Sequence, residues 1–185
     1  MLYVVEMDFV ETSRQAEWDA WYVEHLHVLL SVPGFHTAQR FVCLTTCRAP
    51  WLAIYSVESP DVFESAPYRA RGGRDSTGAW KPLMRNWDRN VFDGIERAPA
   101  VGAEQLLLLA DAEPASVRSL DIDFCWLEVV GLDRTVTRRG LAVVDAALGR
   151  RLALAPMMDT VRAYRPLMAQ LDSSTLGPTD KGSQP

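Results

Sequence analysis

The stretch that decides the fold runs from residue 2 to residue 35, LYVVEMDFVETSRQAEWDAWYVEHLHVLLSVPGF, and its hydrophobic period changes along the way. In the first eight residues apolar side chains alternate, so that the odd positions from Tyr3 to Phe9 share one face, which is typical of a β-strand with one buried side. From residue 17 the apolar side chains recur at helical spacing, and Pro33 with Gly34 ends the run. The stretch therefore predicts a strand, a long helix and a turn into a second strand.

The pattern continues in a β-α-β-β-α-β order over residues 1–98. Further strands are expected at residues 35–47, 51–59 and 86–95, with a short helix within residues 59–73. This is the order of a ferredoxin-like unit, in which the helices cover one face of an antiparallel sheet. The other face must be covered too, and a second sheet is the usual cover.

After a linker at residues 96–102, the chain shows a weaker version of the same pattern. Strands are expected at residues 104–112, 123–132 and 157–167, and a helix at residues 133–149. Residues 99–171 are thus predicted to be a degenerate second repeat without a counterpart of the first long helix, and residues 172–185 a disordered tail. The predicted fold class is α+β, with tandem ferredoxin-like halves and antiparallel sheets that form a barrel within one chain or between two chains.

Composition and charge exclude several kinds of partner. The chain of 185 residues has 19 basic and 24 acidic side chains, a formal net charge of −5 and no long basic run, which argues against nucleic acid as a partner. The apolar run at residues 103–112 is far shorter than the ~20 residues that span a bilayer. No basic leader precedes an apolar stretch, so we expect no membrane association and a cytoplasmic location.

The sequence predicts neither a metal nor a cofactor. Its three cysteines, Cys43, Cys47 and Cys125, are expected to be free thiols. No second pair of ligands accompanies Cys43 and Cys47, so a zinc site is not predicted. The phosphate-binding loop, the dinucleotide fingerprint, the nucleophile elbow and the H-E-x-x-H motif are all missing, which excludes nucleotide hydrolysis, dinucleotide binding and zinc proteolysis.

His25 is the residue of most chemical interest. A helical wheel places four side chains within a ~60° arc of the buried face, with Trp21 just beside it: Trp18, Tyr22, His25 and Leu29. His25 is therefore predicted to face the sheet and His27 to meet solvent. Three roles are open for His25: a hydrogen-bonded core histidine, an acid–base group in a pocket walled by aromatic rings, or a haem or metal ligand. Burial would keep its imidazole neutral near pH 7, able to accept or relay a proton.

Weaker candidates lie on the neighbouring strands. Glu6 and Asp8 share the less apolar face of the first strand, and Arg40 is a possible ion-pair partner for either carboxylate. The register leaves open whether Glu6 and Asp8 face His25 or the barrel interior. Tyr55 is either a core residue or a hydroxyl donor to a ligand.

One run of residues matches a known pattern. The positions that carry the match are Trp18, Trp21, Tyr22, Glu24, His25 and Leu26, followed by Val32, Pro33, Gly34, Phe35 and Arg40. This run resembles the dimeric α/β-barrel superfamily, and in particular its EthD-like branch. The close match covers residues 17–41, and a looser one extends through residues 51–63 and the segment around Trp80 and Trp87. The resemblance implies two ferredoxin-like sheets packed face to face, with a pocket between helix and sheet. It also implies a superfamily of small oxygenases, haem-degrading enzymes, isomerases and auxiliary proteins of degradation operons.

The sequence therefore predicts a small enzyme that acts on a hydrophobic, aromatic or polyketide-like molecule by cofactor-free oxygenation, isomerisation or decarboxylation. His25 is the predicted catalytic residue, and the predicted substrate-binding residues are Trp18, Trp21, Tyr22, Leu29, Arg40 and Tyr55. Two alternatives stay open: a non-catalytic ligand-binding or auxiliary protein of a degradation pathway, and a structural protein without a ligand. A small hydrophobic ligand is the expected partner, and a homodimer or higher homo-oligomer the expected assembly.

Overall fold

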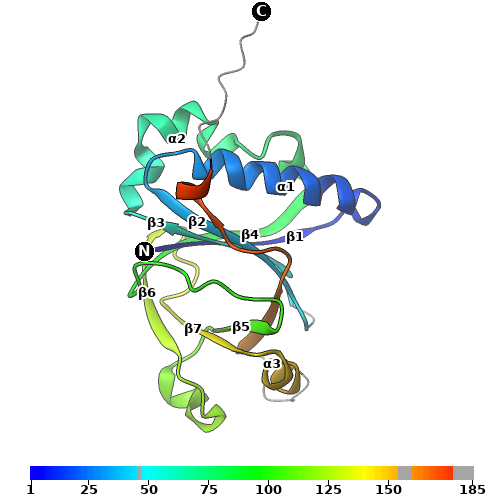
Figure 1. Cartoon of the computed structure of the whole chain (residues 1–185), viewed down its shortest axis with the longest axis vertical. Helices are drawn as coiled ribbons and strands as arrows, with labels where there is room; N and C mark the ends of the chain where they lie inside the picture. The colour runs from blue at the N-terminus through cyan, green and yellow to red at the C-terminus, as the bar shows by residue number, and fades with distance from the viewer. Residues whose placement is uncertain (46, 154–159, 177–185) are drawn as a thin grey trace, which may run out of the picture.

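The computed structural model describes residues 1–45, 47–153 and 160–176, and these form a closed barrel of eight antiparallel strands with few helices (Figure 1). The first half of the chain supplies four neighbouring strands in the order β2-β3-β1-β4. Their bounds are β1 Leu2–Phe9, β2 Phe35–Cys43, β3 Trp51–Val57 and β4 Met84–Asp93.

The second half supplies the other four strands in the order β6-β7-β5-β8. Their bounds are β5 Gln105–Ala110, β6 Cys125–Leu132, β7 Arg138–Asp145 and β8 Val161–Pro166. The halves are joined by pairing of β4 with β6 and of β2 with β8, and the short β9 (Leu171–Asp172) pairs with β2 beyond the end of β8. The barrel therefore closes within one chain and requires no second copy for closure.

The helices cover the two halves unequally. Helix α1 (Gln15–Leu30) and α2 (Ala66–Ala70) lie over the sheet of β1 to β4, whereas α3 (Ala146–Ala153) lies at the opposite end of the molecule beside β5 (Figure 1). Short 3-10 turns complete the connections: η1 Thr12–Arg14, η2 Pro60–Glu64, η3 Gly73–Asp75, η4 Gly78–Leu83, η5 Pro114–Leu120 and η6 Ser173–Thr175. Among the described residues, none of these helices is both long and apolar enough to cross a membrane.

The alternation of β1 separates two hydrophobic cores. Tyr3, Val5 and Met7 pack with the buried face of α1. Leu2 and Val4 point to the other side and pack with second-half residues inside the barrel. Each large apolar side chain buried in either core contributes about 1.5–3 kcal/mol. Because successive side chains of a strand point to opposite faces, one strand serves both cores.

The prediction of a helix at residues 133–149 is wrong over most of that range. Residues 138–145 form β7, which pairs with β5 on one side and β6 on the other, and α3 begins only at Ala146. The run Leu141-Ala142-Val143-Val144 is a short apolar stretch that suits a helix or a buried strand equally well by periodicity. The segment forms a strand because it pairs with β5 and β6, and periodicity within the segment does not reveal these partners.

The C-terminal segment is structured as far as residue 176. Residues 171–175, which include the start of the predicted tail, form β9 and η6. The last part of the predicted tail, residues 177–185, lies outside the described residues.

Candidate functional site

Helix α1 presents its buried face to β1, β2 and β3, and this face positions the candidate site. The buried side chains of α1 are Trp18, Tyr22, Leu26, Leu29 and Leu30. Their centre lies between Tyr22 and Leu26, so that half-buried His25 lies at the edge of this face and not in its middle as predicted. The reason is that Leu26 and Leu30 widen the apolar face on the side away from His25.

Two aromatic rings hold the imidazole of His25. Its ring is stacked on Trp21, with centroids 4.9 Å apart and an angle of 16° between the planes, and it meets Tyr22 edge to face at 5.8 Å. Desolvation by this packing lowers the pKa of His25 to about 4. The imidazole is therefore neutral at pH 7 and able to accept a proton.

A small cavity, here called the inner cavity, lies beneath α1. Its free volume of about 20 Å³ is room for one or two water molecules. Several lining side chains have a polar atom: Tyr3, Tyr22, His25, Tyr55, Thr77 and Trp87 are among them. The wall is thus far more polar than the core around it. The cavity is too small for a haem.

Three tyrosines of the inner cavity, Tyr3, Tyr22 and Tyr55, remain protonated at neutral pH. Burial raises the pKa of Tyr22 to about 12 and raises the pKa values of Tyr3 and Tyr55 further above the ordinary value. The hydroxyls of Tyr22 and Tyr55 are hydrogen-bonded to each other. These groups therefore act as neutral hydrogen-bonding groups and not as bases.

A larger cleft, here called the outer cleft, adjoins the inner cavity. Its volume of about 330 Å³ is at the lower end of the range for small-molecule sites. The two share Tyr68, Gly73 and Arg89 as lining residues, and Leu132 and Asp133 form another part of the outer wall. A ligand with its body in the outer cleft can therefore reach the inner cavity with one edge only.

Arg89 lies at the junction of the inner cavity and the outer cleft. Its side chain is buried, its Nη2 lies 3.3 Å from Asp133 Oδ1, and its backbone N–H donates to Asp133 Oδ2 at 2.9 Å. The guanidinium also lies 5.1 Å from the ring centre of Trp87. Arg89 of β4 is thus fixed by a carboxylate that follows β6 in the second half.

A bulge in β4 brings Trp87 to the helix-facing side of the sheet. Glu6 is opposite Asp88 and Asp8 is opposite Arg85, so that two residues of β4, Asn86 and Trp87, oppose one of β1. Asn86 has a φ of 48°, the left-handed conformation that accommodates such an extra residue. The side chains of Met84, Trp87 and Arg89 consequently line the same cavity.

The inner cavity is lined by four of the predicted site residues: Tyr22, His25, Leu29 and Tyr55. The other three surround it without lining it. Trp18 is fully buried and stacks on Phe9 at 4.6 Å, and Trp21 stacks on His25.

Arg40, the third of these, pairs with neither Glu6 nor Asp8. Its Nη2 donates to Asp19 Oδ1 of α1 at 2.9 Å, and its guanidinium lies 4.2 Å from the ring centre of Tyr22. Arg40 and Glu6 lie on opposite faces of the barrel wall, which rules out the ion pair considered from the sequence.

Glu6 faces the barrel interior and not His25. Its Oε2 lies 2.7 Å from Arg139 Nη1, an ion pair without hydrogen-bond alignment, and its Oε1 accepts from Arg162. Asp111 accepts from Arg139 Nε at 2.6 Å and also from Arg162. The four side chains form a closed ring of alternating charge inside the barrel, here called the ion ring.

Tyr3, Thr77, Trp87 and Arg89 are site residues that the sequence analysis missed. The alternation of β1 contained the signal for Tyr3, because the apolar face of that strand must meet the helix. For Trp87 the bulge at Asn86 removes the simple alternation on which such an inference depends. Thr77 lies in an irregular segment before β4, where no periodicity applies.

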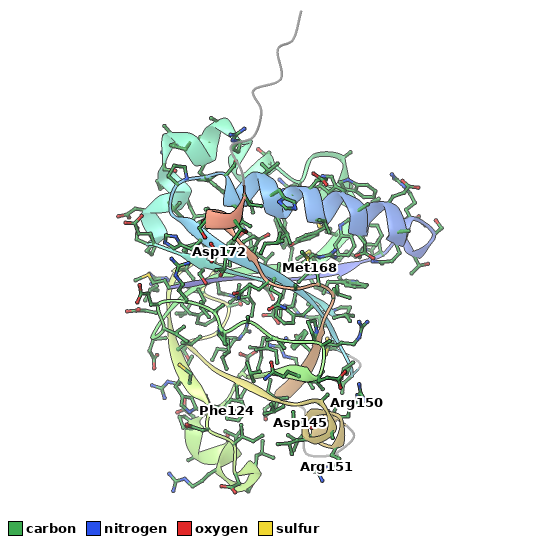
Figure 2. The ribbon with its side chains drawn as sticks, in the orientation of Figure 1. Phe124, Asp145, Arg150, Arg151, Met168 and Asp172 are labelled. Carbon is green, nitrogen blue, oxygen red and sulfur yellow. The ribbon has the colours of Figure 1, made fainter. Side chains whose placement is uncertain are left out.

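The described residues contain no group of three or more His, Cys, Asp or Glu side chains able to hold a metal ion. A further groove of about 470 Å³ lies between η5 and the start of β6, near Phe124 and Trp126. Phe124 lies at the end of the molecule opposite α1, far from the inner cavity (Figure 2).

Comparisons with known proteins bear on the fold. No family model matches the chain, and no curated protein matches it. A solved structure described as "Crystal structure study of anthrone oxidase-like protein" is similar, with a TM-score of 0.51, 10% sequence identity and coverage of 93% of each chain. Likeness at this identity shows only that the two chains share a fold.

Proposed function

We propose that this chain is a small enzyme that acts on a hydrophobic, aromatic or polyketide-like molecule without a cofactor. One observation carries the proposal: His25, neutral because it is desolvated, lines a polar cavity that adjoins a cleft of ligand size. A neutral histidine is in the protonation state that a general base needs. Because its lowered pKa makes it a weak acceptor, the proposed substrate is a carbon acid that forms a stabilised enolate. The ligand body would occupy the outer cleft, with its reacting edge toward His25.

The similar solved structure makes anthrones the first substrate class to test. An anthrone has a CH₂ group between two aromatic rings and opposite a ketone, and loss of one proton gives a delocalised enolate. In the proposed reaction His25 accepts that proton, and dioxygen is the oxidant. The enolate carbon bonds to O₂, and the O–O bond then breaks with loss of water, so that anthrone and O₂ give anthraquinone and H₂O. In this proposal Tyr22 and Tyr55, which line the inner cavity, exchange their mutual hydrogen bond for one to a ligand oxygen.

The finer fold assignment is part of the same proposal. We infer that the two halves are tandem ferredoxin-like repeats of an EthD-like chain, the second being degenerate. The support is that β4-β1-β3-β2 and β8-β5-β7-β6 have the same order when each half is numbered from its first strand. In the second half η5 occupies the place in the chain that α1 has in the first. The proposal therefore includes one site per chain.

The test is oxygen consumption with anthrone by wild type, His25→Gln and His27→Gln. The His27 variant is a matched control, since it makes the same change on the same helix away from the inner cavity. We expect His25→Gln to lower the enzymatic rate above the buffer background by about 10²–10⁴-fold. His27→Gln should stay within twofold of wild type.

Equal rates for His25→Gln and wild type would overturn the role of His25. Anthrone binding without turnover would favour the non-catalytic alternative. Binding is measured by thermal shift, where a ligand at 100 times its Kd adds about 2.7 kcal/mol. A protein of this size gains ~2–4 °C per kcal/mol, so such binding is detectable. Neither binding nor turnover would favour the structural alternative.

A further inference from the structure

Two hydrogen-bonding groups of the inner cavity have no partner within the described part of the protein. They are the Thr77 hydroxyl and the Trp87 indole N–H, and both atoms are buried. Thr77 as a whole is only 6% exposed. Both residues line the inner cavity beside His25. An unpaired buried polar group destabilises the folded state, so two in one cavity indicate a partner that the folded chain does not supply.

The missing partner has to be an acceptor. An indole N–H can only donate, and a threonine hydroxyl can do so as well. None of the described residues that line the inner cavity has a carboxylate, whereas Arg89 does line it, and its guanidinium also lies over the ring of Trp87. The cavity thus offers donors and the guanidinium of Arg89, whose carboxylate partner Asp133 lines the outer cleft and not the inner cavity. The imidazole of His25 adds no charge at pH 7. Such a site favours an oxygen that has, or develops, negative charge.

The size of the inner cavity limits what enters it. A free volume of about 20 Å³ admits an oxygen atom or a water molecule but no aromatic ring. The outer cleft has room for the ring system. A ketone or phenol oxygen at the edge of a ring therefore fits the arrangement, with the ring outside and the oxygen inside.

We propose that Thr77 and Trp87 form an oxygen-binding pair that receives the carbonyl or phenolate oxygen of the ligand. This rests on the proposed function for the identity of the ligand and adds the part of the site that selects it. In the proposed reaction the same pair would hold the ketone oxygen while it becomes an enolate. The pair then discriminates an oxygenated aromatic molecule from its hydrocarbon counterpart, because only the first satisfies both donors.

Two matched probes, 2-naphthol and naphthalene, differ only in the oxygen. We expect wild type to bind 2-naphthol at least tenfold more tightly than naphthalene. Thr77→Val, which keeps the side-chain shape, and Trp87→Phe should each lower the affinity for 2-naphthol about tenfold and leave that for naphthalene within twofold. Thr12→Val and Trp80→Phe are controls outside the inner cavity and should preserve the preference. Calorimetric binding and a melting curve for each variant separate lost affinity from lost folding.

A second measurement requires only the wild-type protein once the resonance is assigned. The indole N–H signal of Trp87, identified by its loss in Trp87→Phe, should move downfield in a ¹⁵N correlation spectrum when 2-naphthol is added and stay in place with naphthalene. An unmoved signal, or an unchanged preference in Thr77→Val, would overturn the oxygen-binding pair and leave the cavity to water. If Thr77→Val leaves the anthrone kinetics unchanged while His25→Gln lowers the rate, the oxygen-binding pair is refuted and the proposed enzymatic function stands. If the preference for 2-naphthol over naphthalene depends on Thr77 but the protein does not turn over anthrone, the oxygen-binding pair stands and the proposed enzymatic function is refuted.

Discussion

At the scale of single residues, His25 links the site to the pH dependence of stability. In the unfolded chain an ordinary histidine takes up a proton as the pH falls below about 6.5, whereas folded His25 does so only near pH 4. Falling pH therefore favours the unfolded state from about pH 6.5 down to about pH 4. Above that window the contribution of His25 to stability is constant.

We expect His25→Gln to remove this dependence. Between pH 7 and pH 5, wild type should lose up to about 2 kcal/mol of unfolding free energy that the variant does not lose, at 1.36 kcal/mol per pKa unit. Urea unfolding of both proteins at pH 7, 6 and 5 measures the difference. A constant gap between the two curves would show that the imidazole titrates normally in the folded protein. The same pKa predicts that the anthrone rate is flat from pH 6 to pH 8.

Cys43 is the thiol for which the structure predicts the highest reactivity. A hydrogen bond from the Cys47 thiol is the main reason why the pKa of Cys43 is lowered to about 6, burial opposes it, and Thr45 Oγ1 adds a contact at 3.4 Å. The same pairing raises the pKa of Cys47. Cys43 is therefore largely thiolate at pH 7 and Cys47 is not.

We expect iodoacetamide to modify Cys43 before Cys47 at pH 7, with a midpoint near pH 6. In Cys47→Ala the midpoint should move upward toward that of an ordinary thiol, because the donor is gone. Timed alkylation between pH 5 and pH 9, read by peptide mass spectrometry, follows both residues. Equal rates for the two thiols in wild type would contradict the assigned hydrogen bond.

Residue-scale prediction from the sequence works where a simple period holds. The helical spacing of α1 correctly indicated that Tyr22 and Leu29 face the sheet and, at the edge of that face, His25. Arg40 could not be assigned its partner, because Asp19 and Arg40 are brought together only when α1 crosses β2. Thr77 is beyond such reasoning altogether, since it lies between two 3-10 turns with no repeat to follow.

At the scale of elements, the bulge in β4 is the device that shapes the inner cavity. Asn86 adopts the left-handed conformation, and its Nδ2 donates to the Arg48 carbonyl at 2.8 Å. Without the extra residue, Trp87 would lie on the opposite face from Met84. The bulge therefore interrupts the regular pairing of β4 with β1 and brings the indole N–H of Trp87 into the cavity.

We expect Asn86→Gly and Asn86→Val to separate the two contributions of Asn86. Both variants lose the hydrogen bond to Arg48, but only glycine tolerates a φ of 48° without strain. The valine variant should be about 1–2 kcal/mol less stable than the glycine variant in urea unfolding. It should also bind 2-naphthol more weakly, because relief of the strain flattens the bulge and moves Trp87. Equal stability of the two variants would refute backbone strain at this position.

The boundary between β7 and α3 shows where element prediction fails. The alternation of β1 and the long period of α1 were decisive because each extends over eight residues or more. In the second half, apolar residues of β7 run directly into the helix-forming Ala146-Ala147-Leu148, so that one continuous helix fits the pattern. Only the pairing of β7 with β5 and β6, at a distance along the chain, distinguishes the two elements.

At the scale of the whole molecule, the ion ring links the halves of the barrel. Glu6 comes from β1, whereas Asp111 follows β5, Arg139 comes from β7 and Arg162 from β8. Burial alone would raise the pKa of Glu6, but the two guanidiniums outweigh it and lower the pKa below its ordinary value. Glu6 therefore stays charged at every pH above its ordinary range and is the first half's only member of the ring.

We expect Glu6→Gln to destabilise the protein by about 3–5 kcal/mol, because it leaves the buried Arg139 and the half-buried Arg162 with one carboxylate. Glu128→Gln is the matched control, since its pair with Arg138 is exposed and screened by solvent, so that its loss should change the unfolding free energy little. Urea unfolding at pH 7 compares them. The effect of Glu6→Gln should persist at high salt, as buried pairs are screened little. Similar small losses in both variants would mean that the ring adds nothing to stability.

The overall architecture was predictable in outline. Seven of the eight barrel strands and their division into two halves follow from the sequence pattern, whereas β7 was predicted as part of a helix. The need to cover the second face of each sheet gives the barrel. The sequence left closure within one chain or between two undecided, because β2 and β8 are joined by only three residue pairs whose partners are far apart in the chain. The expected homo-oligomer remains a prediction.

The position of β8 in the barrel has a consequence for how the chain folds. This strand lies between β5 and β2, so the last long strand to be synthesised fills the remaining gap. Until residues 161–166 are available, β2 and β5 each have an open edge, which is the feature that promotes association between nascent chains. Contacts between residues about 120 positions apart also slow folding, because a long loop must close first. A ribosome pause before residue 161 would therefore be the period in which this protein most needs a chaperone.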